Sequence, residues 1–173
     1  MEKYIPDRYQ KSIYTIDYDN LLNCGIKCLL FDLDNTIAPI GLSEPTKKTK
    51  ELFKKLKEKG FKLVIFSNSN KKRLKPFKEI LDVDCCASAL KPFSGKFLKV
   101  LKEYDLDVSE VAIIGDQILT DIVGGNNVGI TTILINPVST KDFWLTRINR
   151  MFEKRIINKL SKRDLFYKGK YYE

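Results

Sequence analysis

Short apolar runs alternate with amphipathic helical segments along most of this 173-residue chain. Five runs have the length and composition of buried strands: residues 27–31, 62–66, 83–88, 111–114 and 130–135. Helical spacing and helix-end residues lie between them, at residues 44–59, 71–81, 92–104 and 118–127. Apolar strands joined by helices are typical of a parallel sheet covered on both faces. We therefore predict an α/β fold, a Rossmann-like three-layer sandwich with a five-stranded, mostly parallel sheet.

Length and composition are those of one globular domain over residues 1–173. Hydrophobic residues make up 43% of the chain, but no stretch approaches the roughly 20 apolar residues that a membrane span requires. Residues 1–25 lack the apolar core of a signal peptide and are interpreted as an N-terminal extension. The four cysteines form no CxxC spacing, which is typical of a reducing compartment. We expect a cytoplasmic protein.

The chain contains no histidine. Catalytic triads that use histidine are therefore excluded, and a zinc site would have only thiolates as soft ligands. Any catalysis must rely on carboxylates, hydroxyls, lysine and a hard metal ion.

Polar side chains follow four consecutive predicted strands, at the point where each strand ends. Because the carboxyl ends of parallel strands meet at one edge of a sheet, where ligands bind, we expect these side chains to converge. They are Asp32 and Asp34 after the first strand, Ser67 and Asn68 after the second, Lys91 after the third, and Asp116 and Asp121 after the fourth.

Neighbouring carboxylates repel each other unless a cation or a shared proton compensates them. Asp32, Asp34 and Asp116 would form the oxygen-rich pocket that suits Mg²⁺. Such a site could hold a phosphate group and favour phosphoryl transfer. Hydrogen bonds and positive charge for the phosphoryl oxygens would come from Ser67, Asn68 and Lys91.

Four segments resemble, in order, the four motifs of the haloacid dehalogenase superfamily of aspartate-dependent phosphatases. They are DLDNT at 32–36, Ser67 within FSNSN, the pair Lys91-Pro92, and GDQILTD at 115–121. The segments YIPDRY, GDQILTDIVGGNNVG and FWLTRINRMFEKRI extend the resemblance to the bacterial YqeG family over nearly the whole chain. That family is similar to the mitochondrial phosphatidylglycerophosphate phosphatases.

The resemblance implies a role for each matching residue. Asp32 would be the nucleophile that forms an aspartyl-phosphate intermediate. Asp34 would protonate the leaving oxygen and then deprotonate the attacking water, while its backbone carbonyl helps to hold Mg²⁺. The supporting roles are phosphate binding by Ser67, Asn68 and Lys91, completion of the metal site by Asp116, orientation of the loop by Thr36, and support of the metal ligands by Asp121.

The spacing of the motifs leaves no room for a cap domain. Only 32 residues separate Asp34 from Ser67, and 23 separate Ser67 from Lys91. An open site favours large phosphoesters, and we predict an Mg²⁺-dependent phosphomonoesterase that converts phosphatidylglycerophosphate to phosphatidylglycerol. A phosphoprotein or nucleotide phosphatase is the alternative enzyme. A non-catalytic, receiver-like phospho-switch is a third hypothesis, against which Asp34 argues because it would speed hydrolysis of the aspartyl-phosphate.

The C-terminal tail, residues 141–173, carries ten basic and four acidic residues, much of the net charge of +9. An apolar stripe at helical spacing runs through it, formed by Leu145, Ile148, Phe152, Ile156 and Leu160. Two interpretations are open: the stripe packs on the sheet as its last helix, or it lies on an anionic membrane face with Phe143 and Trp144 as anchors. The chain has no repeat of aromatic and basic residues of the kind that binds nucleic acids, so we do not expect nucleic-acid binding.

Overall fold

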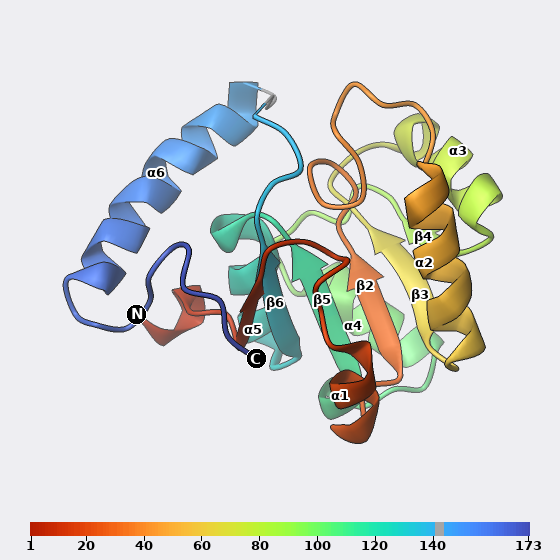
Figure 1. The fold of residues 1–173 in the computed structure, drawn as a ribbon, viewed down its shortest axis with the longest axis horizontal. Helices are drawn as coiled ribbons and strands as arrows, with labels where there is room; N and C mark the ends of the chain where they lie inside the picture. The colour runs from red at the N-terminus through yellow and green to blue at the C-terminus, as the bar shows by residue number, and fades with distance from the viewer. Residues whose placement is uncertain (141–143) are drawn as a thin grey trace.

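The computed structural model describes residues 1–140 and 144–173, and the side chains of residues 1–140 and 148–173. Six parallel strands form one sheet in the order β1-β6-β5-β2-β3-β4 (Figure 1). The strands are β1 (Arg8–Gln10), β2 (Cys28–Phe31), β3 (Lys62–Phe66), β4 (Asp84–Cys86), β5 (Val111–Gly115) and β6 (Thr131–Ile135).

The three central strands end level with one another. All residues of β2 and β5 are buried, as expected for parallel strands covered on both faces. Phe31, the last residue of β2, lies opposite Ile65 of β3 and Ile114 of β5. The residues that follow these strands therefore emerge at one edge of the sheet, which we call the rim: Asp32, Ser67 and Asp116.

Helices cover both faces of the sheet. On one face, side chains of α1, α2 and α3 pack against Leu29 and Phe31. On the other face, α4 packs against Cys28 and Leu30, because side chains alternate between faces along a strand. The helices are α1 (Tyr18–Asn23), α2 (Lys47–Glu58), α3 (Lys71–Leu81), α4 (Gly95–Glu103), α5 (Val123–Val128) and α6 (Trp144–Ser161), with short helical turns η1 (Glu2–Tyr4), η2 (Val108–Glu110) and η3 (Ile118–Ile122).

This architecture confirms the predicted α/β, Rossmann-like three-layer fold. Residues 32–91 are described throughout, and they contain only α2, α3, β3, β4 and their connections, with no inserted cap domain. Among the described residues, no helix combines the length and apolar content needed to cross a membrane.

The prediction of five strands is wrong by one. Residues 8–10, within the segment interpreted as an N-terminal extension, form β1 and pair with β6. Tyr9 is buried against Leu134 and Phe166, and its backbone also bonds to Tyr172. A three-residue edge strand carries too short a pattern to be recognised from alternation of polar and apolar residues.

The helix predicted over residues 118–127 consists of two parts. It begins as the wide π-helical turn η3, in which the Ile122 N–H bonds to the Gln117 carbonyl, and continues as α5. The expected end at Gly129 is confirmed, since Gly129 has the left-handed φ of 86° that glycine adopts readily. Such π turns recur at functional sites.

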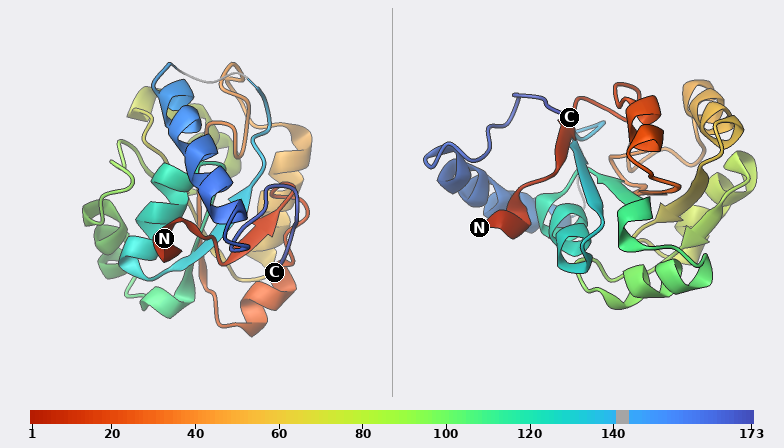
Figure 2. Two further views of the ribbon diagram at one scale, coloured as in Figure 1. Left: turned by 90° about the vertical axis from the view of Figure 1, so that its left-hand side faces the viewer. Right: turned by 90° about the horizontal axis from the view of Figure 1, so that it is seen from below.

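Helix α6 packs on the β1 end of the sheet through its second half (Figure 2). Leu160 is buried and Ile156 partly buried in a cluster with Tyr9 and Leu134. The packing interpretation therefore holds for this half of the predicted stripe. Ile148 and Phe152 are exposed instead. The proposed anchor Phe143 lies outside the described residues, and so do the side chains of Trp144 and Leu145.

Candidate active site

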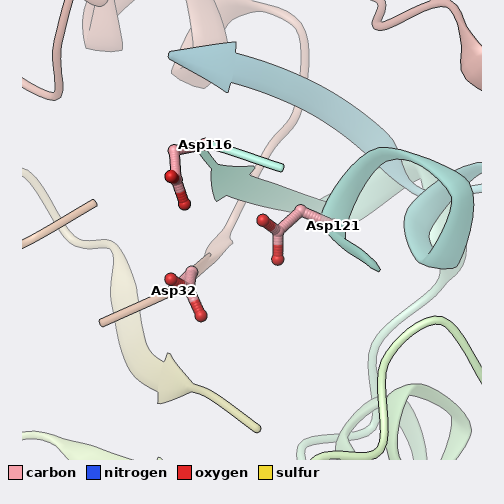
Figure 3. A group of neighbouring side chains, drawn as sticks. All are labelled: Asp32, Asp116 and Asp121. Carbon is pink, nitrogen blue, oxygen red and sulfur yellow. The ribbon is translucent and has the colours of Figure 1, made fainter. Parts of the chain in front are cut away.

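Three buried carboxylates meet at the rim. Asp32 follows β2, Asp116 follows β5, and Asp121 lies in η3. One oxygen from each lies within 4.8 Å of the others, and Figure 3 shows the three groups pointing toward a common space. Each of these residues is at most 6% exposed. Close, buried carboxylates of this kind can hold a divalent ion.

Asp121 reaches the cluster because of two local features. The π turn widens the backbone between residues 117 and 122, and the Gln117 N–H donates to Asp121 Oδ2 at 3.1 Å. Gly115 makes the approach possible, because a Cβ atom there would lie 2.2 Å from Asp121 Cγ. The expectation that Asp121 only supports the metal ligands therefore differs from the structure, in which it lies in the carboxylate cluster itself.

Lys91 lies between two of these acids. Its Nζ donates to Asp32 Oδ1 at 2.6 Å, to Asp121 Oδ1 at 2.7 Å and to the Phe66 carbonyl at 2.9 Å. Although burial opposes the charged form, the Asp121 and Asp32 carboxylates raise the pKa of Lys91 above its ordinary value. Lys91 is therefore held as an ammonium ion directly beside the predicted nucleophile.

The carboxylates are only partly compensated by cations. Burial raises the pKa of Asp32 to about 7, against the opposing charge of Lys91. Burial likewise raises the pKa of Asp116 to about 8, against the opposing charge of Arg150. In both groups burial disfavours the charged carboxylate by more than the neighbouring cation favours it. The donor set, hard carboxylate oxygens in a buried cluster, fits a divalent cation such as Mg²⁺.

The predicted phosphate-binding residues Ser67 and Asn68 lie directly after β3. Asn68 pairs with the Lys91 backbone in both directions, accepting its N–H at 2.8 Å and donating to its carbonyl at 3.2 Å. Ser67 is buried, and its Oγ accepts the Ser69 N–H at 3.2 Å. Thr36 donates to Asp116 Oδ1 at 3.3 Å. The Asn68 side chain thus fixes the loop that carries Lys91, and Thr36 joins the first motif to the fourth.

The Asp34 side chain is not part of the carboxylate cluster. Arg73 donates from Nε and Nη2 to Asp34 Oδ1 at 3.0 and 2.9 Å, and Ser69 Oγ donates to Oδ2 at 2.6 Å. The ion pair with Arg73 is largely screened from solvent. This geometry separates the two acids of the DLDNT motif, because Asp32 faces Lys91 while Asp34 faces α3. Among the residues predicted to contribute to the metal site, only Asp34 has its carboxylate elsewhere.

Helix α6 also contributes to the rim. Arg150 forms an ion pair with Asp116 Oδ2 and donates to the Asp116 carbonyl at 2.6 Å. Glu153, one turn later, is buried, contacts Arg150 at 3.3 Å and accepts the Leu119 N–H at 2.9 Å. The C-terminal helix is therefore connected to the carboxylate cluster by a buried polar network.

Sequence reasoning missed four residues of this site: Ser69, Arg73, Arg150 and Glu153. Arg73 and Ser69 follow a motif residue closely, so their place near the second strand end was a signal that could have been used. Arg150 and Glu153 gave no comparable signal, because a basic amphipathic segment has the same pattern whether its charges face solvent or protein.

Comparison with known proteins shows similarity to one hydrolase family. A family model described as a haloacid dehalogenase-like hydrolase matches residues 38–129. The probable phosphatase YqeG of Bacillus subtilis is 36% identical over 92% of this chain and 93% of that protein. Phosphatidylglycerophosphate phosphatase 1 of Arabidopsis thaliana, chloroplastic/mitochondrial, is 27% identical over 93% of this chain, which spans only 49% of that protein.

Solved structures share the architecture at low identity. The cobalt-bound deoxy-D-mannose-octulosonate 8-phosphate phosphatase YrbI of Haemophilus influenzae superposes with a TM-score of 0.54 at 14% identity. The match covers 83% of this chain and 94% of that one, and it concerns the fold alone.

The resemblance recognised from four strand-end motifs is confirmed by the family model and by similarity along nearly the whole chain. The prediction of an enzyme is confirmed with it, since the family is one of hydrolases. The chain belongs to the haloacid dehalogenase-like hydrolases and, within them, to the YqeG proteins.

Proposed function

We propose that the protein is a phosphomonoesterase that works through an aspartyl-phosphate on Asp32. The observation that carries the proposal is the Lys91 ammonium, held 2.6 Å from the Asp32 carboxylate in a buried pocket that also contains Asp116 and Asp121. A phosphate group bound beside Lys91 would present its phosphorus to Asp32 while its charge is neutralised.

The reaction divides into two steps. In the first, Asp32 attacks phosphorus, the phosphoester bond breaks, and Asp34 gives a proton to the leaving alcohol oxygen. In the second, Asp34 accepts a proton from water, which attacks the aspartyl-phosphate and releases inorganic phosphate. Arg73 and Ser69 hold the Asp34 carboxylate in place between these steps.

The remaining residues bind and orient the phosphate. Ser67 Oγ accepts the Ser69 N–H, so its hydroxyl proton can be donated to a phosphoryl oxygen. Asn68 supports the site indirectly through the Lys91 backbone. A Mg²⁺ ion would be held by the carboxylates of Asp32, Asp116 and Asp121 with the Asp34 backbone carbonyl, and it would offset the charge of the phosphate oxygens.

We propose phosphatidylglycerophosphate as the substrate, hydrolysed at the cytoplasmic face of a membrane. Its support is the similarity to the Arabidopsis protein of that name, together with a rim that no cap domain covers between residues 32 and 91. The exposed Ile148 and Phe152 and the basic residues of α6 are suited to contact with such a membrane.

A phosphate-release panel tests the proposal. Purified protein is assayed with phosphatidylglycerophosphate in mixed micelles, a nucleotide, a phosphopeptide and an aryl phosphate, each with Mg²⁺ and with EDTA. We expect multiple turnover on the lipid and the aryl phosphate with Mg²⁺ only. Asp32→Asn should lower the rate at least about a thousandfold, because the nucleophile is lost.

Asp105→Asn is the matched control, because Asp105 is exposed, lies before η2 outside the site, and has a left-handed φ that asparagine tolerates. Full activity of this variant shows that loss of one acid is not harmful in itself. Turnover of the nucleotide or the phosphopeptide, with no turnover of the lipid, would refute the proposed substrate. A single stoichiometric labelling of Asp32 without turnover would favour the phospho-switch.

A further inference from the structure

Two large apolar side chains are exposed directly beside Lys91. Leu90 is 62% exposed and Phe93 73% exposed, the highest values among the large apolar side chains that the structure describes. Leu90 has a φ of 56°, in the left-handed region that is unfavourable for residues with a side chain. The loop therefore holds Leu90 outward in a conformation that its own backbone disfavours.

The same loop forms a shallow hollow with basic residues at its border. The hollow measures about 320 Å³ and continues into the first turns of α4. We call it the Leu90–Phe93 surface, lined by Ala89, Leu90, Phe93, Gly95, Lys96 and Lys99. Apolar side chains next to lysines form the pattern of a surface that meets anionic headgroups and acyl chains together.

This surface is rigidly connected to the candidate active site. Lys91 follows Leu90 in the chain, and Asn68 fixes its backbone through two hydrogen bonds. The Lys91 ammonium contacts Asp32 at the same time. A ligand seated on the Leu90–Phe93 surface would thus lie next to the residue that neutralises the substrate phosphate.

A second exposed apolar group lies at the other end of the sheet. The first half of α6 exposes Ile148, Met151 and Phe152, while Arg150 of the same half reaches Asp116 at the rim. Helix α6 packs over β1 and β6 (Figures 1 and 2). The Leu90–Phe93 surface instead follows the edge strand β4 in the chain. In the order of the strands, these two exposed groups lie on either side of β2 and the carboxylate site.

We propose that the Leu90–Phe93 surface docks on an anionic lipid bilayer. Leu90 and Phe93 enter the boundary between headgroups and acyl chains, and Lys96 and Lys99 contact lipid phosphates. The net charge of +9 favours this occupant over a second copy of the chain, because two such basic surfaces would repel each other. The proposal rests on the proposed function only in that the docked lipid would be the source of the phosphomonoester.

A tryptophan placed at position 93 tests the docking. The chain has a single tryptophan, so Phe93→Trp in a Trp144→Phe background reports on this surface alone. We expect its emission to shift to the blue with vesicles of equal parts phosphatidylglycerol and phosphatidylcholine, and to be quenched by brominated acyl chains. Val108→Trp in the same background is the control, because Val108 is 41% exposed but precedes β5, at the edge opposite the rim. Its emission should not change.

Sedimentation with vesicles measures how much this surface contributes to the affinity for the membrane. Leu90→Ser/Phe93→Ser should lower the affinity for the same vesicles about tenfold or more, since the apolar area available for burial is lost. Val108→Ser should leave it unchanged, and circular dichroism melting verifies that each variant is folded. An unshifted emission at position 93, or an affinity that survives the double serine variant, would overturn the proposal.

Other occupants are separated in the same experiments. If the protein binds vesicles of phosphatidylcholine alone as tightly as the mixed vesicles, the proposed preference for anionic lipids is overturned. If the tryptophan emission at position 93 shifts with protein concentration in the absence of vesicles, and size-exclusion chromatography shows a dimer, the surface binds a second copy of the chain. This result would overturn the proposed docking on a bilayer. None of these measurements depends on catalysis. Failure of vesicle docking with intact hydrolysis of the aryl phosphate therefore leaves the phosphatase activity standing, and the reverse result rejects only the activity.

Discussion

Removal of the Lys91 ammonium should destabilise the protein strongly. Its Nζ contacts the Asp32 and Asp121 carboxylates and the Phe66 carbonyl, and the side chain is 2% exposed. Lys91→Met keeps most of the volume but leaves two carboxylates without their cation. Removing one partner of a buried ion pair costs about 3–5 kcal/mol, and two carboxylates place this variant toward the upper value. For a chain of this length the loss corresponds to a melting temperature lower by roughly 6–20 °C.

Urea denaturation in EDTA, followed by circular dichroism, measures the loss. Lys72→Met is the matched control, because Lys72 lies exposed on α3, and we expect its free energy of unfolding to stay within about 0.5 kcal/mol of the parent. Adding Asp32→Asn and Asp121→Asn to Lys91→Met should recover at least half of the loss, because the uncompensated charges disappear. A loss below about 1 kcal/mol, or no recovery, would show that charge compensation at Lys91 is not what stabilises the site.

Three further predictions concern the surrounding residues. Because burial raises the pKa of Asp32 to about 7 and of Asp116 to about 8, the folded metal-free protein binds more protons than the unfolded chain between about pH 4 and these values. Its free energy of unfolding should therefore fall as the pH rises through that interval, with a smaller slope in Asp116→Asn; equal slopes in urea titrations would contradict this. Arg73→Ala should lower kcat on an aryl phosphate by about ten- to a hundredfold, with partial recovery in Arg73→Lys, because Asp34 loses its orienting bonds; an unchanged kcat would exclude the role. Arg150→Gln should weaken Mg²⁺ binding in calorimetry about ten- to a hundredfold, since Arg150 orients Asp116; equal or tighter binding would mean that Arg150 competes with the ion instead.

The central sheet was predictable because its signals are local. β2 and β5 are continuous apolar runs, and each ends at an aspartate that the structure places at the rim. β1 was not predictable in the same way. Its three residues are stabilised by pairing with β6, in which Arg8 lies opposite Ile133, 125 residues later in the chain, and by contact with the C-terminal segment. Such long-range pairing leaves no periodic pattern in the strand itself.

The C-terminal tail is a second case in which the sequence pattern predicted the helix but not its contacts. The apolar spacing predicted a helix, and α6 begins at Trp144 and ends at Ser161. Spacing could not decide which apolar residues are buried, because Ile148 and Leu160 belong to the same stripe yet only Leu160 is covered. Nor could it reveal that Arg150 turns toward Asp116. Those outcomes depend on where the helix axis lies relative to the sheet.

The sequence by itself determined the order of the strands β2 to β6 and of the helices between them, and the polar residues at the strand ends, because periodicity and position along a strand are local properties of the chain. Only the tertiary structure decided how the charges are partnered: Asp34 with Arg73, Asp116 with Arg150, and Asp121 with Lys91. The physical reason is that a buried charge takes whichever opposite charge the packing brings within hydrogen-bond distance, and no spacing rule connects residues on separate elements.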